Sequence, residues 1–335
     1  MDIIDFKQDH VSKARKLALD NYGRERQLVK ELPENVTIPD LNYFAEIGLG
    51  AAAVEGSTLL GYLCAYPPRE DAFATTNVRG TFVPIHAHAV TADRTEKDRM
   101  RIYSLLYQAA ADKWVKAGIR SHAIALYTYD KTGIQSFFYN GFGLRCIDLI
   151  RSLEELPKDR TVIKAENQKL EDNQKPEYVE LFRDEWGLLL DQHNALINHL
   201  GNSPSFMRFE ILEEDLLYRQ AQEDVRYFAA KVKGKFIAYI KLSEHGENFA
   251  TEADDMMNIC GAYCEPAYRS TGIYHNLLCY VMRVLRKEGF IRLGVDCESF
   301  NPTARGFWLK YFKEYTHSVV RRIDEKAVDL AISDC

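Results

Sequence analysis

The sequence has no excess of positive charge and no pattern of paired cysteines. Its 43 Lys and Arg residues face 49 Asp and Glu residues, so the formal charge is -6 at pH 7. A groove that follows a nucleic-acid backbone needs basic residues, and we therefore expect no nucleic-acid partner. The 7 cysteines are an odd number and include no C-x-x-C pair, and we expect no secretory leader before them. We expect reduced thiols and a cytoplasmic protein.

A long apolar run is also missing. The most apolar stretch, residues 48–66, has Glu55, Gly56, Ser57 and Thr58 at its middle, which rules it out as a membrane span. It is better interpreted as two strands and a turn, and no membrane partner is expected.

The chain is long enough for about two domains. It has 335 residues, and a domain typically has about 150. Charged residues make up 27% of the chain and hydrophobic residues 46%, a globular composition that can fill buried cores.

The two halves of the sequence resemble each other at a constant distance. Residues 102–118 match residues 273–289 at Ile, Tyr, Leu, Lys and Gly positions that are 171 apart. The same distance separates Asp130 from Asn301 without a gap. This repeat indicates an internal duplication. We expect domains at residues 1–153 and 162–335, joined by the polar stretch 154–173.

Hydrophobic periodicity gives the same order of elements in both halves. In the first half we expect a helix at 11–22, a hairpin at 50–54 and 59–65, and a strand at 81–90; in the second, a helix at 176–200 and strands at 225–232, 236–242 and 257–264. A helix, a short strand (293–298 in the second half) and another helix follow. Strand, helix and strand form a βαβ unit, so the two strands should be parallel neighbours whose carboxyl ends bind the ligand.

The loop before the helix at 273 has features of an anion site. A helix start presents free N–H groups, and Gly272 lacks the Cβ that would hold a phosphate away from them. Arg269 adds a cation three residues earlier. An ordinary loop and helix cap is the alternative, because this spacing alone is weak.

The surrounding sequence resembles the GNAT acetyltransferase superfamily. The resemblance rests on R-S-T-G-I-Y (269–274), V-D-C-E-S (295–299) and N-P-T-A-R-G-F-W (301–308), each placed after a strand or before a helix as in that family. The family's loop has the form Q/R-x-x-G-x-G/A, and Tyr274 departs from its last small residue. The resemblance implies an α+β fold with two tandem GNAT-like domains, each a mixed, mostly antiparallel sheet flanked by helices. The residues that it implies in binding acyl-CoA, with acetyl-CoA expected, are Ala262, Tyr263, Cys264, Arg269, Ser270, Thr271, Gly272, Ile273, Tyr274 and Asn301.

The first half lacks the loop glycine. At the distance of 171, Arg101 stands opposite Gly272 and Asp98 opposite Arg269. An arginine side chain and a carboxylate make binding of a diphosphate by N–H groups less favourable. We therefore expect a degenerate first domain and one acetyl-CoA per chain.

Candidates for proton transfer lie in the second half. Alternation along strand 293–298 puts Asp296 and Glu298 on one face, where two close carboxylates would raise the proton affinity of one. Glu298 is our candidate base, with a wet sheet edge or an arginine partner as the alternative. The resemblance implies a tyrosine acid in the last helix, but Trp308 takes its position, and Tyr311 is the nearest candidate. His86 and His88 could bind a metal from one strand face, but no third ligand follows, and we predict none.

The resulting prediction is an acyl-CoA-dependent N-acyltransferase that acts on a small-molecule or peptide amine. A non-catalytic acyl-CoA-binding or regulatory protein is the main alternative. Aminoacyl transfer from tRNA is a third, which the net charge of -6 disfavours.

Overall fold

The computed structural model describes residues 1–70, 77–157, 175–213, 217, 224–246, 248, 252–326 and 328. The chain forms two compact units: Met1–Asp148 with Asn248–Ala250 and Glu314–Cys335, and Leu149–Glu247 with Thr251–Lys313. The domains expected from the sequence differ from these units, because the last strand of the chain belongs to the first unit.

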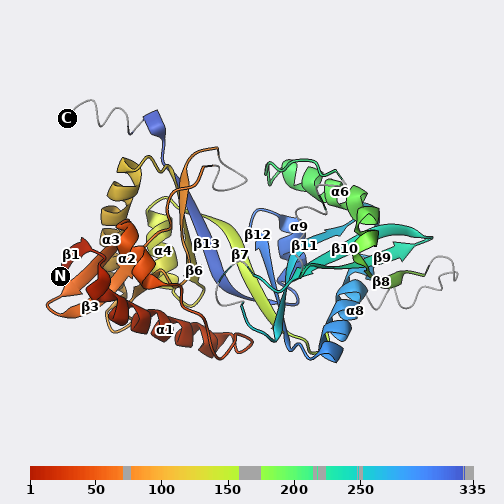
Figure 1. Cartoon of the computed structure of the whole chain (residues 1–335), viewed down its shortest axis with the longest axis horizontal. Helices are drawn as coiled ribbons and strands as arrows, with labels where there is room; N and C mark the ends of the chain where they lie inside the picture. The colour runs from red at the N-terminus through yellow and green to blue at the C-terminus, as the bar shows by residue number, and fades with distance from the viewer. Residues whose placement is uncertain are drawn as a thin grey trace. The chain divides into compact units, whose positions relative to one another are not determined.

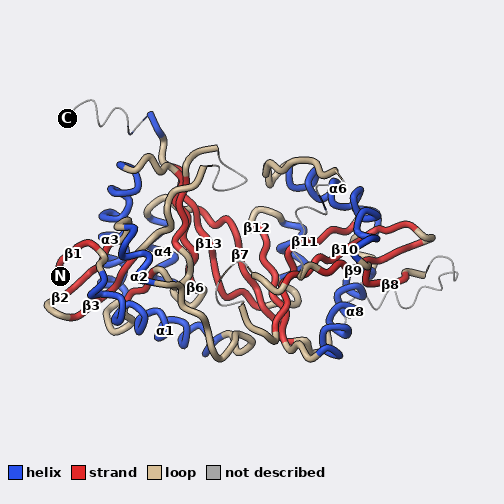
Figure 2. The backbone as a smooth tube through the Cα atoms, in the orientation of Figure 1, coloured by secondary structure: helices blue, strands red, loops and turns tan. Residues whose placement is uncertain are grey.

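The first unit contains a four-stranded sheet, a second group of strands and four α-helices among its described residues. Its elements are β1 (Asp2–Asp5), a 3-10 turn (Gln8–His10), α1 (Val11–Leu28), α2 (Leu41–Ile47), β2 (Ala51–Glu55), β3 (Thr58–Leu63), β4 (Gly80–Val83), β5 (His88–Val90), α3 (Glu96–Lys116), β6 (Ser121–Tyr127), α4 (Lys131–Tyr139), most of β7 (Gly143–Ser152) and most of β13 (Lys313–Arg322). The strand orders are β1-β2-β3-β5 and β4-β6-β13-β7. Figure 2 shows α3 and α4 side by side, where they contact each other.

The strand expected at 81–90 is wrong, because the structure has two strands there. β4 pairs in parallel with β6, whereas β5 pairs with β3 in the other sheet. Pro84 stands between them, and proline cannot donate a hydrogen bond to a ladder. The carbonyl of Pro84 instead accepts from the N–H of Ala87 at 2.9 Å. This turn leads the chain from the sheet that contains β4 to the four-stranded sheet that contains β5.

The second unit is a mixed sheet with helices on both faces. Its elements are β8 (Glu177–Leu181), a 3-10 helix (Arg183–Leu189), α6 (Leu190–Gly201), β9 (Arg226–Val232), β10 (Lys235–Ser243), β11 (Met256–Cys264), a 3-10 turn (Pro266–Tyr268), α8 (Ile273–Glu288), β12 (Arg292–Glu298) and α9 (Pro302–Trp308). The strand order is β7-β12-β11-β10-β9-β8, in which β7 contributes its last residues. Figure 1 shows α6 and α8 on opposite sides of this sheet.

The helix expected at 176–200 is wrong in its first part. Tyr178 and Val179 belong to β8, which pairs with β9 at the edge of the sheet. Aromatic and β-branched side chains favour this strand, and the α-helix begins only at Leu190.

The repeat is visible in the secondary structure. β6 and β12 begin and end 171 positions apart, and each is followed by a helix whose N-cap side chain, Asp130 or Asn301, accepts a backbone hydrogen bond three residues on. The expected fold class is confirmed: each half is an α+β domain with a mixed, mostly antiparallel sheet.

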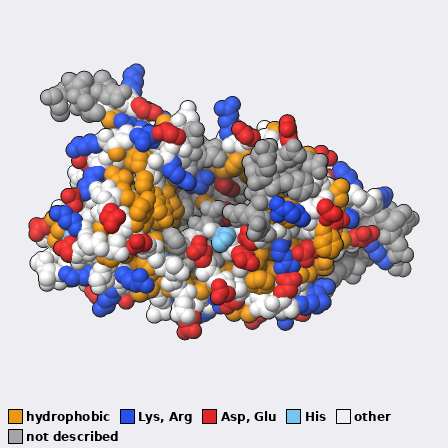
Figure 3. Space-filling view, viewed as in Figure 1, with side chains coloured by type: hydrophobic (Ala, Val, Ile, Leu, Met, Phe, Trp, Pro, Cys, Tyr) orange, Lys and Arg blue, Asp and Glu red, His pale blue; other side chains and the backbone are white. Residues whose placement is uncertain are grey.

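The surface is mixed in charge, and none of the described helices resembles a membrane span. Basic and acidic side chains are interspersed on the face drawn in Figure 3. No helix in the described part of the chain is both long and apolar enough to cross a membrane.

Candidate functional site

In the sheet of the second unit, a gap separates the ends of two neighbouring strands. β11 and β12 are parallel partners only from Met256 opposite Arg292 to Ile259 opposite Val295. Beyond Ile259, β11 continues with β10 alone, as far as Cys264. A register shift in the β10 pairing leaves Cys260 as an extra residue, and such a bulge bends the strand that carries it. The last residues of β11 therefore have a free edge toward β12.

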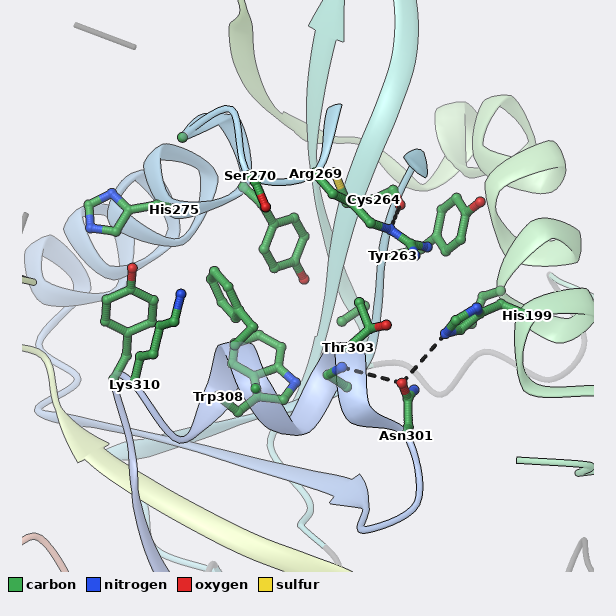
Figure 4. Close-up of a pocket in the computed structure, with 18 residues that line it drawn as sticks. His199, Tyr263, Cys264, Arg269, Ser270, His275, Asn301, Thr303, Trp308 and Lys310 are labelled. Carbon is green, nitrogen blue, oxygen red and sulfur yellow. Dashed lines mark hydrogen bonds between the residues drawn. The ribbon is translucent and has the colours of Figure 1, made fainter. Parts of the chain in front are cut away.

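A cavity of about 370 Å³ lies at this gap. Its walls come from the end of β11, the following loop, the first turn of α8, α9 with the residues after it, and α6. The lining residues are Leu196, His199, Ala262, Tyr263, Cys264, Arg269, Ser270, Gly272, Tyr274, His275, Asn301, Thr303, Ala304, Gly306, Phe307, Trp308, Lys310 and Tyr311, and Figure 4 shows them around the opening.

The loop ends in an open helix start. Ser270 and Gly272 both have left-handed backbone conformations, with φ of 60° and 83°, and glycine adopts such a conformation at no steric cost. Gly272 is the N-cap of α8, with no side-chain cap and no acidic residue in the first turn. Thr271 holds the turn by donating from its hydroxyl to the carbonyl of Tyr268 at 2.7 Å. The N–H groups of this helix start are thus uncapped by a side chain, and they favour an anion.

Arg269 braces the end of β11. Its Nε donates to the carbonyl of Cys264 at 3.0 Å, and its guanidinium lies 5.8 Å from the ring centre of Tyr263. Burial raises the pKa of Cys264 to about 11, so this thiol is protonated near neutral pH and is a poor nucleophile.

Aromatic rings form the wall between α8 and α9. The ring of Tyr274 makes edge contacts with Phe307, at 5.0 Å between centres, and with Trp308, at 6.1 Å. Burial raises the pKa of the Tyr274 phenol well above its ordinary value. The turn therefore accommodates the unexpected tyrosine by directing its ring toward α9.

His275 and Tyr311 meet at one end of the cavity. The centres of their rings lie 5.4 Å apart in an edge contact, and Lys310 also lines the cavity. His275 is only 5% exposed, and its Nε2 has no hydrogen-bond partner among the described residues.

His199 and Asn301 meet on another side of the cavity. His199 comes from the last turn of α6, and its Nε2 lies 3.5 Å from Oδ1 of Asn301. The same Oδ1 caps α9 by accepting from the N–H of Ala304 at 3.3 Å. No local motif in the sequence marks His199, His275 or Lys310, and His199 contacts a residue 102 positions away.

Most of the residues implied in acyl-CoA binding line the cavity, and Tyr311 does too. Thr271 and Ile273 lie in the loop and helix start but are not among the lining residues. Glu298 is half-buried at the end of β12, where its carbonyl accepts from the N–H of Asn301 at 3.0 Å. Neither Glu298 nor Asp296 is a lining residue of this cavity.

The first unit has a helix where the second has its loop. α3 begins at Glu96, six positions earlier than the repeat with α8 would give, so Asp98 and Arg101 are helical. Thr95 caps this helix by accepting from the N–H of Asp98 at 3.2 Å. Arg99, in the first turn, forms a largely buried ion pair in which its Nη2 lies 2.8 Å from Oδ1 of Asp130.

His86 and His88 of the first unit are engaged in other contacts. Nε2 of His86 lies 2.5 Å from the hydroxyl of Tyr127, and Nε2 of His88 lies 2.6 Å from the carbonyl of Ala125. In the described part of the chain no three His, Cys, Asp or Glu side chains are grouped to hold a metal ion.

Comparison with known proteins agrees with this geometry. Residues 193–312 match the model of the acetyltransferase (GNAT) family. The fold is similar to a GCN5-related N-acetyltransferase from Sphaerobacter thermophilus, with a TM-score of 0.52, 10% identity and coverage of 96% of this chain and 95% of that one. It is also similar to a fungal multi-domain GH3 β-N-acetylglucosaminidase that contains a glucosamine N-acetyltransferase region, with a TM-score of 0.53 and 13% identity. The match covers 95% of this chain and 38% of that longer protein.

No curated protein matches the chain in sequence. The family match is confined to residues 193–312, whereas the similarity of fold extends over nearly the whole chain.

Proposed function

We propose that the second unit is an N-acyltransferase that transfers an acyl group, acetyl in the first place, from CoA to an amine. The observation that carries this proposal is the gap between β11 and β12 beyond Ile259, with an uncapped helix start beside it. A thioester with a long polar arm and a diphosphate needs both an extended backbone edge and an anion site.

The donor would lie along the chain's own backbone groups. The diphosphate would accept hydrogen bonds from the N–H groups of Gly272, Ile273 and Tyr274, with Ser270 and Thr271 shaping the turn. The amide groups of the CoA arm would pair with the free edge of β11 at Ala262, Tyr263 and Cys264. Asn301 would border the acyl end.

Transfer requires three things of the protein besides alignment of the two substrates. A base takes a proton from the ammonium group, an N–H group holds the negative oxygen of the tetrahedral intermediate, and an acid protonates the departing thiolate. A backbone N–H at the end of β11 would hold the oxygen. Tyr311 lines the cavity and remains our candidate acid. Glu298 remains a prediction for the base, and would act through a water molecule because it does not line the cavity.

The test separates catalysis from binding. Calorimetry with acetyl-CoA measures affinity and stoichiometry, and release of free CoA thiol is followed with 2-phenylethylamine, tyramine, putrescine, glucosamine and a lysine peptide. We expect micromolar binding and amine-dependent thiol release. Binding without release by any amine would support a non-catalytic acyl-CoA-binding protein, and absence of binding would refute the proposal.

A further inference from the structure

We propose that His199 is the general base that takes the proton from the acceptor amine, and that Asn301 holds it in the required tautomer. The inference rests on the proposed acyltransferase function and adds a residue to its machinery. Three observations support it: the position of His199 on α6, the hydrogen-bond partner of its Nε2, and the types of residue that line the cavity.

The cavity offers few groups that can accept a proton. No carboxylate is among its lining residues in the described part of the chain. Burial raises the pKa of Cys264 to about 11 and that of Tyr274 well above its ordinary value, so neither is ionised near neutral pH. Arg269 and Lys310 are cations. Imidazole is the side chain that exchanges protons in this range, and two imidazoles line the cavity, those of His199 and His275.

Asn301 fixes which nitrogen of His199 carries the lone pair. Because its Oδ1 accepts from the N–H of Ala304, the amide cannot turn its NH₂ group toward that position. The same Oδ1 lies 3.5 Å from Nε2 of His199, so Nε2 must carry the hydrogen and Nδ1 is left as the acceptor. Contacts of this kind are often long before substrate binds. Figure 4 shows the pair facing each other across the edge of the cavity.

The helix termini favour His199 over His275 as a base. His199 lies in the last turn of α6, where the partial negative charge of the helix end stabilises an imidazolium. His275 lies in the first turn of α8, where the field of the helix opposes a positive charge. The same helix start is the proposed diphosphate site, which suits His275 to the donor rather than to the acceptor.

One imidazole is enough to account for the proton that the ammonium group loses before the reaction. The ammonium group R–NH₃⁺ gives one proton to Nδ1 of His199 and becomes R–NH₂. Its nitrogen then attacks the thioester carbon, the C–N bond forms, and the carbonyl electron pair moves to oxygen. When that pair returns, the C–S bond breaks and the hydroxyl of Tyr311 protonates the departing thiolate to give CoA thiol. The second nitrogen proton then restores the hydroxyl of Tyr311. His199 releases its proton to solvent.

The experiment uses the full chain and four variants. His199→Gln keeps size and polarity but removes the base. Asn301→Asp keeps an oxygen that can cap α9, and its charge stabilises the imidazolium. Asn301→Ser caps the helix but is too short to reach His199. His245→Gln is the control, because His245 is exposed in the same unit and does not line the cavity.

We expect turnover and its pH dependence to change while the affinity for acetyl-CoA is nearly kept. His199→Gln lowers kcat by about 10²-fold or more, removes the acidic limb of the pH profile and changes acetyl-CoA affinity less than threefold. Asn301→Asp moves that limb to higher pH, and Asn301→Ser does not. In ¹⁵N spectra of the free protein, His199 carries its hydrogen on Nε2, and its titration midpoint rises in Asn301→Asp. The other charged or titratable side chains that line the cavity are the same in all variants: Tyr263, Cys264, Arg269, Tyr274, His275, Lys310 and Tyr311.

The results separate the two proposals. If the wild-type chain releases CoA thiol with an amine but His199→Gln retains kcat and the acidic limb, the role of His199 is refuted and the acyltransferase stands. In that case Glu298→Gln, measured in parallel, tests the base predicted from the sequence. If the spectra place the His199 hydrogen on Nδ1, the role of Asn301 is refuted even when no amine in the panel reacts.

Discussion

The Nε of Arg269 donates a 3.0 Å hydrogen bond to the carbonyl oxygen of Cys264, and so ties the first residue of the R-x-x-G loop to the last residue of β11. The two parts of the proposed donor site, the free strand edge and the helix start, are held in one geometry by this contact. The arginine therefore acts on the backbone around the ligand and not only by its charge.

Replacing Arg269 should weaken acetyl-CoA binding through this brace. A hydrogen bond from a charged group contributes about 1.5 kcal/mol, so we expect Arg269→Ala to raise the Kd about tenfold. Arg269→Lys should recover little, because an ammonium cannot reproduce the planar contact with Tyr263. Arg305→Ala is the control, since Arg305 also donates to a backbone carbonyl, that of Ser299 at 2.6 Å, but does not line the cavity. Equal losses in both variants would contradict the brace.

Gly272 should be essential for the anion site. We expect Gly272→Glu to abolish acetyl-CoA binding, because it puts bulk and negative charge at the uncapped helix start. Gly289→Glu offers a matched control: Gly289 ends the same helix with a φ of 97°, and a Cβ added there would meet open space. Both substitutions strain a left-handed residue by about 1 kcal/mol, so a similar loss of thermal stability with a loss of affinity only at Gly272 identifies the site.

One acetyl-CoA should bind per chain, in the second unit. In the first unit, Arg99 and Asp130 form a buried pair whose side chains are 12% and 4% exposed. Arg99→Ala leaves that carboxylate buried without its cation, although Tyr103 and Gly133 still donate hydrogen bonds to it. We therefore expect a loss of about 3 kcal/mol in unfolding free energy and an unchanged Kd. At a ligand concentration 100 times the Kd, acetyl-CoA should stabilise the second unit by about 2.7 kcal/mol. Two equivalent sites by calorimetry would be incompatible with this view.

The sequence predicts those parts of the structure that depend on interactions between residues near each other in the chain. The repeat distance of 171 relates the bounds of β12 to those of β6, and the Asn301 cap to that of Asp130, because strands and caps depend on nearby residues. The partner of a strand, in contrast, can be far away in the sequence. β13 pairs with β6 of the first unit, with Thr316 opposite Tyr127, and no pattern in residues 313–322 names that partner.

The candidate site shows the same division. The loop at Arg269 and Gly272 has a motif that can be recognised, and both residues line the cavity. His199 approaches Asn301 only because α6 packs on β11, a contact that no spacing in the sequence implies. Alternation placed Glu298 and Asp296 on one face of β12, but it could not tell whether that face borders the cavity.

Tyr311→Phe should test the acid without disturbing its surroundings. The ring makes edge contacts with His275 and with Phe307, at 5.4 and 5.1 Å between centres, and phenylalanine preserves both. We expect kcat to fall about 10²-fold while acetyl-CoA affinity is retained. Unchanged kcat would leave Tyr311 as a packing residue of the cavity wall.

Buried neutral histidines should make both units less stable in mild acid. Burial lowers the pKa of His122 in the first unit and of His193 in the second to about 4 each. Their rings lie against Tyr107 and Tyr239, whose hydroxyls are 2.9 and 3.1 Å from the respective Nδ1 atoms. Between about pH 6.5 and 4 the unfolded chain binds a proton at each site and the folded chain does not, so stability falls as pH falls.

From pH 7 to pH 5 we expect each histidine to lower the unfolding free energy by roughly 2 kcal/mol. Urea unfolding at a series of pH values measures this slope, and the range avoids the titration of ordinary carboxylates near about pH 4. Glutamine cannot take up a proton, so His193→Gln should reduce the slope for the second unit while the slope for the first unit stays as in the wild type. A stability that is flat or rises from pH 7 to pH 5 would mean that these imidazoles are charged, or free to become charged, in the folded chain.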